Sequence, residues 1–207
     1  MRDYKWGDML FNYGMLPQTW EDPSHIDPDA NAKGDGDPVD AVEFGARQMA
    51  SGSVAPVRVL GVLGMIDDGE ADWKVRAPGR GTARLVVGLC LRTACAPPAQ
   101  VLVLRLDDPL AATVHDVAGL ELALPGAVSA LREWLRVYKV AEGKPVNSFC
   151  LEEKAMPPAF AEAVIARTHT DWAAAHASKR NAGLPYSDVP PPETGAEGAA
   201  KKRRPKL

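Results

Sequence analysis

The sequence is poor in cysteine and has no long hydrophobic run, and each absence excludes a class of protein. The 207 residues contain three cysteines, Cys90, Cys95 and Cys150, an odd number in no metal-ligand spacing. We therefore expect no disulfide framework and no zinc site, and we predict a reducing compartment, the cytoplasm. No run of about 18 apolar residues is present, so no membrane span is expected. Residues 1–14 also lack the apolar core of a secretory signal.

Neither sign of charge is in strong excess. The formal net charge is −3, with 25% charged and 46% hydrophobic residues. These values are typical of a globular chain, which at this length buries a core as one domain, here residues 1–180. Nucleic-acid binding needs a concentrated positive face, and the basic cluster of residues 201–206 belongs to a Pro/Gly-rich segment, residues 181–207. We interpret that segment as a disordered tail, whose basic cluster is either solvated or a nuclear-localisation patch.

The most informative stretch is the loop Gly-Asp-Gly-Asp-Pro-Val-Asp of residues 34–40, which holds Asp35, Asp37 and Asp40. From residue 21 to residue 43 there are eight acids and one base. Carboxylates so close together repel one another unless a cation lies among them. Oxygen donors without histidine or cysteine suit Mg²⁺ or Ca²⁺ rather than zinc, and the spacing does not fit an EF-hand. The loop alone leaves two interpretations open, a magnesium site and a solvated acidic turn.

Hydrophobic periodicity predicts strands in the first half of the chain and helices in the second. Residues 57–65 are apolar and β-branched, a second strand begins at Trp73, and residues 101–106 continue in strand character. After Pro125 the apolar residues follow a helical spacing, and residues 157–177 are typical of a closing helix. The order predicts an α+β, mainly β fold in which helices pack on a β-barrel.

Further motifs accompany the acidic loop in a fixed order. They read NYGMLPQTWEDP, MIDDGEADWK, EWLRVYK and GKPVN, and they occupy residues 12–23, 65–74, 133–139 and 143–147. With GDGDPVD they resemble the soluble family I inorganic pyrophosphatases in their eukaryotic form, from about Phe11 to about Trp172. The resemblance implies an OB-like twisted β-barrel flanked by helices and hydrolysis of pyrophosphate to two phosphates. It also implies Mg²⁺ as the cofactor, with Mn²⁺ as a substitute, and a homodimer.

The resemblance implies a role for each matching acid. Asp35, Asp40 and Asp72 would hold one metal, and Asp67 would join Asp72 in holding metal that arrives with the substrate. Asp37 would act as the general base on the attacking water. The ordinary alternative is that Asp67 and Asp72 only begin and end a turn.

The resemblance also implies a substrate-binding set, Tyr13, Lys74, Tyr138 and Lys139. Lys74 follows Asp72 by two residues, so both side chains point to the same side of a strand. Tyr138 and Lys139 would bind the leaving phosphate, through a hydroxyl donor and a point charge. The alternatives are a core aromatic for Tyr13 and a solvated lysine for Lys139.

The first departure from the family pattern lies inside the chain. Leaving out residues 75–100 joins Lys74 to Val101 and restores the pattern with no gap. We therefore interpret residues 75–100 as an insertion. It is either a retained intron, since a valine codon begins with GT and a glutamine codon can end in AG, or a surface loop.

The second departure lies at the start of the chain. The family's amino-terminal strands, with an acidic pair, a lysine and an arginine of its active site, have no counterpart here. We therefore expect a truncated chain whose barrel is open at one edge. The alternative function is a catalytically impaired pyrophosphatase-like protein that binds Mg²⁺ and phosphate or packs against a complete subunit. A plastid or mitochondrial location remains an alternative to the cytoplasm, because a targeting segment would lie in the missing part.

Overall fold

The computed structural model describes residues 5–24, 26–27, 29–67, 70–72, 85–88 and 100–178, and for residues 32, 67, 70–72 and 85–88 it describes the backbone. The strands are β1 (Asn12–Met15), β2 (Ile26–Asp27), β3 (Ala32–Lys33), β4 (Asp40–Glu43), β5 (Val54–Leu63), β6 (Met65–Asp67), β7 (Glu70–Asp72), β8 (Leu85–Gly88), β9 (Gln100–Arg105) and β10 (Ser148–Phe149). The helices are α1 (Val117–Ala123), α2 (Ala127–Val137) and α3 (Pro158–Ala177), and short 3₁₀ turns cover Pro109–Ala112, Val140–Glu142 and Leu151–Glu153.

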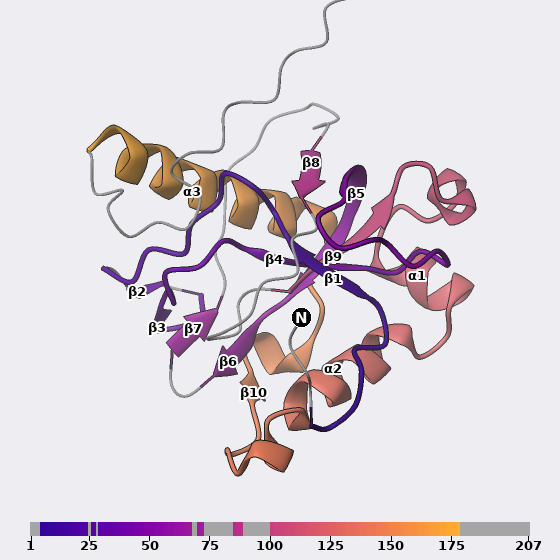
Figure 1. Cartoon of the computed structure of the whole chain (residues 1–207), viewed down its shortest axis with the longest axis horizontal. Coiled ribbons are helices and arrows are strands. Elements are labelled where there is room, and N and C mark those ends of the chain that lie inside the picture. The colour runs from indigo at the N-terminus through magenta and orange to yellow at the C-terminus, as the bar shows by residue number, and fades with distance from the viewer. Residues whose placement is uncertain are drawn as a thin grey trace, which may run out of the picture.

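A β-barrel forms the centre of the molecule, and helices cover it (Figure 1). Its strands follow the order β1-β4-β9-β5-β8, with β4 and β9 parallel and the other neighbours antiparallel. β8 pairs with β5 over four residues and meets β1 through the single pair Met15–Gly88. The predicted mainly β, barrel-based fold is confirmed. The expected open edge is wrong, because β8, from the predicted insertion, lies between β1 and β5 and closes the strand order.

The pairing of β5 is irregular where this strand contacts the segment that precedes α3. Its pairing with β9 shifts register between Val59 and Gly61, and Val62 exchanges two backbone hydrogen bonds with Met156, at 3.1 and 2.7 Å. A Cβ on Gly61 would come within 2.4 Å of the Met156 carbonyl oxygen and 2.5 Å of Val117. Glycine is therefore needed here because two backbones approach closely.

We expect the substitution Gly61→Ala to lower the free energy of unfolding by about 1–3 kcal/mol, because the added methyl group has no space in a packed core. Urea unfolding measures the effect. Gly119→Ala is the matched control: Gly119 lies within α1, and a Cβ there meets its nearest atom at 3.3 Å. That atom belongs to the Asp116 side chain, which can shift, and alanine is favoured over glycine in a helix by about 0.5–1 kcal/mol, so any loss at Gly119 should be much smaller than at Gly61. Equal losses at the two positions would contradict the steric explanation.

The helices bury the faces that the sequence predicts. Val128, Leu131, Trp134 and Leu135 of α2 all lie in the main core cluster, together with Leu102 of β9. The helix α3 packs against β5 and buries a second face, whose members are Ala161, Val164, Ile165 and Thr168. The predicted helical segments are confirmed. Within the described ranges, no helix combines the length and the apolar character that a bilayer crossing requires.

Two small sheets lie beside the barrel. β2 and β3 form a two-stranded hairpin, and β10, β6 and β7 form a three-stranded sheet. The hairpin is joined to α3 by the ion pair between Asp27, which is buried, and Arg167. The strand β3 also contacts β7, so the chain just before the acidic loop lies beside the β6–β7 hairpin (Figure 1).

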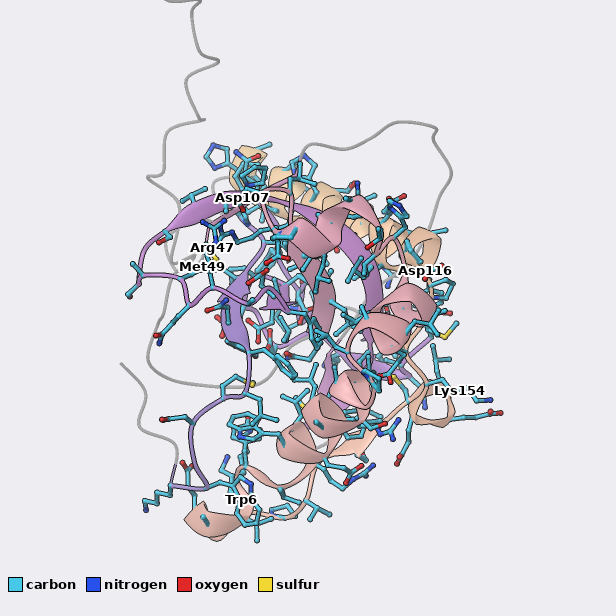
Figure 2. All side chains as sticks on the ribbon, turned by 90° about the vertical axis from the view of Figure 1, so that its right-hand side faces the viewer. Trp6, Arg47, Met49, Asp107, Asp116 and Lys154 are labelled. Carbon is cyan, nitrogen blue, oxygen red and sulfur yellow. The ribbon has the colours of Figure 1, made fainter. Side chains whose placement is uncertain are left out.

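A separate group of charges links the loop that follows β4 to the loop that follows β9. Arg47 lies next to Asp107 (Figure 2) and donates to its carboxylate at 2.8 Å. Arg105 donates to the same carboxylate at 2.6 Å, and the two arginines lower the pKa of Asp107. Asp107 is exposed, so this network contributes little to stability. We assign it a local structural role.

Candidate functional site

The acidic loop of residues 34–40 is held from outside by the segment of residues 16–21. The backbone of Glu21 donates to the Asp37 carbonyl oxygen at 2.9 Å and accepts from the Gly36 amide at 2.8 Å. The Trp20 indole donates to the Gly36 carbonyl oxygen at 2.9 Å. The motif TWED therefore fixes the backbone of the loop, and this contact explains why the two motifs occur together.

Two glycines allow this contact. Gly36 has φ = +88°, a left-handed conformation that side chains other than glycine rarely adopt. A Cβ on Gly34 would lie 2.6 Å from the carbonyl group of Glu21. The glycine pattern of GDGDPVD thus follows from the path of the backbone, and it leaves Asp35 and Asp37 half-buried at the loop surface.

Thr19 supplies a third link, through its side chain. Its hydroxyl donates to the Leu16 carbonyl oxygen at 2.6 Å and accepts from the Val39 amide at 2.9 Å. Thr19 is buried, 3% exposed. A buried amide that loses its acceptor costs free energy, so this hydroxyl stabilises the loop next to Asp40.

We expect Thr19→Val to lower the free energy of unfolding by about 1–3 kcal/mol, because valine has the same shape but leaves the Val39 amide without this acceptor. Denaturant unfolding measures the loss. Thr19→Ser keeps the hydroxyl and should lose less. A serine variant as unstable as the valine variant would assign the effect to the methyl group rather than to the hydrogen bonds.

Asp40 lies at the inner end of the loop, on β4, in a polar cluster with Tyr13 and Gln100. The Tyr13 hydroxyl donates to Asp40 Oδ2. Gln100 Nε2 donates to the Tyr13 oxygen at 3.1 Å and to Asp40 Oδ2 at 3.4 Å. The strand register explains the meeting, since Tyr13 is on β1, next to β4, and Gln100 pairs with Asp40. We call these three residues the Tyr13–Asp40–Gln100 cluster.

The electrostatic surroundings of Asp40 favour its neutral form. Burial raises the pKa of Asp40 well above its usual value, and the Tyr13 hydroxyl lowers it. The charges of Asp35 and Glu21 raise this pKa further, whereas Gln100 lowers it. Glu21 is itself fully buried. A group of acids in this state gains free energy when a cation comes near it.

Asp35 and Asp37 form a local turn at the head of the loop. The Asp37 amide donates to Asp35 Oδ1 at 2.7 Å. The structure therefore brings Asp35 and Asp40 close enough for their charges to act on one another, and Asp37 lies between them in the chain.

The remaining predicted ligands belong to the β6–β7 hairpin. Asp67 ends β6, Asp72 ends β7, and Asp72 pairs with Met65. Because β7 contacts β3, the backbone of Asp72 lies near the strand that leads into Asp35. The side chains of Asp67 and Asp72 and the whole of Lys74 lie outside the described residues. Their roles stay predictions.

The donor set of the site fits a hard cation. Asp35, Asp37 and Asp40 offer carboxylate oxygens alone, which Mg²⁺ prefers to nitrogen or sulfur donors. Among the side chains that the structure describes, no three acids, histidines or cysteines converge into a closed metal site. The described residues therefore supply part of a ligand set, and the β6–β7 hairpin would add the rest.

Tyr138 and Lys139 follow α2 and are both buried, at 4% and 3% exposure. The Tyr138 ring stacks on Trp134, with ring centroids 5.0 Å apart, and Lys139 Nζ lies 5.7 Å from the Tyr138 centroid. Tyr138 belongs to the core cluster against which Tyr13 packs. Lysine is rarely buried unless it has a partner, so Lys139 is not the solvated lysine that the sequence left as an alternative.

Three residues of this site were missed by sequence reasoning: Thr19, Glu21 and Gln100. A signal existed for the first two, because TWED precedes the acidic loop in the matching motif. Gln100 gave no signal, since it closes the segment that we interpreted as an insertion.

Comparison with known proteins identifies relatives of one kind. Residues 4–85 match the family model described as inorganic pyrophosphatase. The chain is 42% identical to the soluble inorganic pyrophosphatase 1, chloroplastic, of Chlamydomonas reinhardtii over 175 residues, 81% of this chain and 53% of that one. It is 39% identical to a Drosophila melanogaster inorganic pyrophosphatase over 163 residues, 79% of this chain and 40% of that one. The chain thus spans about half the length of these curated relatives.

Solved structures give the same result for the fold. The recombinant inorganic pyrophosphatase of T brucei brucei superposes with a TM-score of 0.72 at 34% identity, covering 86% of this chain and 44% of that one.

Proposed function

This chain belongs to family I of the inorganic pyrophosphatases, and we propose that it hydrolyses inorganic pyrophosphate to two phosphates. The observation that supports this most is the acidic loop itself. The loop carries Asp35, Asp37 and Asp40, and its backbone is fixed to the TWED segment by four hydrogen bonds. A rigid row of carboxylates at the edge of a barrel suits a reaction in which positioning and charge do most of the work.

We propose Mg²⁺ as the cofactor, with Mn²⁺ as a substitute. Asp35, Asp40, Asp67 and Asp72 would hold it. When bound, it would neutralise the charge of the phosphoryl oxygens and make water more acidic.

The protein's own residues would bind the substrate and move one proton. Asp37 would accept that proton from the attacking water as general base, since it is half-buried and its backbone is held on both sides. Tyr13, Lys74, Tyr138 and Lys139 would bind phosphoryl oxygens. The Tyr13 hydroxyl, now on Asp40, would have to turn toward the substrate to do so.

A phosphate-release assay on the 207-residue chain tests the proposal. Purified protein should release phosphate from pyrophosphate in the presence of Mg²⁺, and EDTA should abolish the release. The Asp37→Asn variant, purified in the same way, excludes a contaminating enzyme. If the folded chain with saturating Mg²⁺ released no more phosphate than this variant, the proposed hydrolysis would be wrong.

We further propose a cytoplasmic homodimer that binds pyrophosphate and phosphate and takes neither nucleic acid nor membrane as a partner. The compartment follows from the cysteine spacing, and the dimer follows from the resemblance to the eukaryotic form. Light scattering on the purified chain tests the dimer, and a mass equal to 22.1 kDa would contradict it.

A further inference from the structure

Gln100 is a buried glutamine, and glutamine is rarely found buried in a protein core. It is the first residue of β9 and is completely buried. It pairs with Asp40 on one side and with Leu63 on the other. Both neighbouring strands therefore fix its backbone, and its side chain joins the Tyr13–Asp40–Gln100 cluster.

The contacts of Gln100 are with two residues of the proposed site. Its Nε2 donates to the Tyr13 oxygen at 3.1 Å and to Asp40 Oδ2 at 3.4 Å. Tyr13 in turn donates to Asp40. A buried amide costs free energy unless its hydrogen bonds are made, so the amide and the two acceptors hold one another in place.

Once the structure places Gln100, its position can be compared with the family pattern. Leaving out residues 75–100 puts Lys74 directly before Val101, which restores the family pattern. With those residues in the chain, the residue directly before Val101 is Gln100. In the order of the chain, Gln100 therefore stands where the motif has the lysine to which the resemblance assigns substrate binding.

We propose that Gln100 is a residue of the substrate site, where its neutral amide takes the place of a phosphate-binding ammonium group and positions Tyr13 and Asp40. The inference rests on the proposed function. It implies that the charge of the motif's lysine is absent from the start of β9, and that Lys74 would have to supply it from another part of the chain. A donor without charge binds a phosphate oxygen less tightly than a charged donor does.

A charge-reversal experiment tests the proposal by binding alone. Gln100→Lys and Gln100→Glu are prepared, and calorimetry measures Mg²⁺ binding without phosphate and phosphate binding at saturating Mg²⁺. The lysine variant should bind phosphate roughly tenfold more tightly and Mg²⁺ more weakly, because its charge attracts the anion and repels the cation. The glutamate variant should show the opposite pair of changes.

The matched control is Gln48→Lys, which makes the same change of charge on an exposed loop residue. Both of its affinities should stay within about twofold of the unmodified chain, because water and salt screen an exposed charge. If Gln100→Lys and Gln100→Glu change phosphate affinity in the same direction, or not at all, Gln100 is only structural and the proposal is overturned.

A third variant covers the case in which neither charged residue is tolerated in the core. Gln100→Met has a similar size and no donor, and it should weaken phosphate binding roughly threefold to tenfold. A folded methionine variant with unchanged phosphate affinity would also overturn the proposal. Because no turnover is measured, the result is independent of hydrolysis. If the chain hydrolyses pyrophosphate but these variants bind phosphate as the unmodified chain does, only this inference is wrong and the proposed function stands.

Discussion

Replacing Asp37 with asparagine should lower the turnover of pyrophosphate by roughly 100-fold to 10,000-fold, the usual contribution of a general base. Asparagine keeps the shape of the side chain but cannot accept a proton. The backbone hydrogen bonds of Asp37, to Glu21 and to Asp35, do not involve its carboxylate, so the loop should keep its conformation. Steady-state kinetics at saturating Mg²⁺ measure the loss, and calorimetry should show a far smaller change in Mg²⁺ affinity.

The control for this change is Asp29→Asn, which removes the same charge from an exposed residue between β2 and β3. Its turnover should equal that of the unmodified chain. The opposite pattern for Asp37→Asn, a collapse of Mg²⁺ affinity with turnover preserved at saturating metal, would make Asp37 a ligand rather than a base.

The elements that the sequence predicts well are those with a local cause. Residues 128–135 place their apolar side chains on one helical face, and α2 buries that face. The β-branched run of residues 57–65 predicts β5, and residues 101–106 predict β9. Each of these patterns depends on which side of an element faces the core, and a single segment contains that information.

Other features depend on residues far apart in the chain. The hairpin of β2 and β3 is only two residues long on each side and is fixed by the ion pair from Asp27 to Arg167, 140 residues away. The closure of the barrel depends on β8, which pairs with β1 through a single residue pair. Periodicity contains no signal for either contact, so no hairpin is predicted from the sequence and an open edge is predicted for the barrel.

The candidate site shows the same division. The motif assigns Asp35, Asp37 and Asp40 to one loop, and the structure shows them on one loop beside Tyr13. The contact of Gln100 with Asp40 follows from strand register, and the burial of Glu21 accompanies its backbone hydrogen bonds to the loop. Spacing in the sequence contains neither. For Asp67, Asp72 and Lys74 the positions of the side chains stay predictions.

The second large effect is expected at Asp40. Its carboxylate would bind Mg²⁺, but its burial lowers the stability of the metal-free protein. Substitution by asparagine removes one oxygen ligand and its charge. We expect Mg²⁺ affinity to fall at least about 100-fold, more than is usual for residues that only support a ligand. In the metal-free protein, however, the same substitution should raise the free energy of unfolding, because it removes a buried charge that lies near Asp35 and Glu21.

The pH dependence gives this expectation its sign. An acid whose pKa is raised by folding, as that of Asp40 is, costs no stability below its unfolded pKa. The cost develops as the pH rises through the raised folded pKa. Metal-free Asp40→Asn should therefore match the unmodified chain in acid and exceed it in stability at neutral pH, as measured by urea unfolding with EDTA. Asp116→Asn, at the exposed N-cap of α1, keeps its cap and is the control. A metal-free Asp40→Asn protein that is less stable at neutral pH would mean that the Tyr13–Asp40–Gln100 cluster stabilises the barrel by more than the buried charge costs.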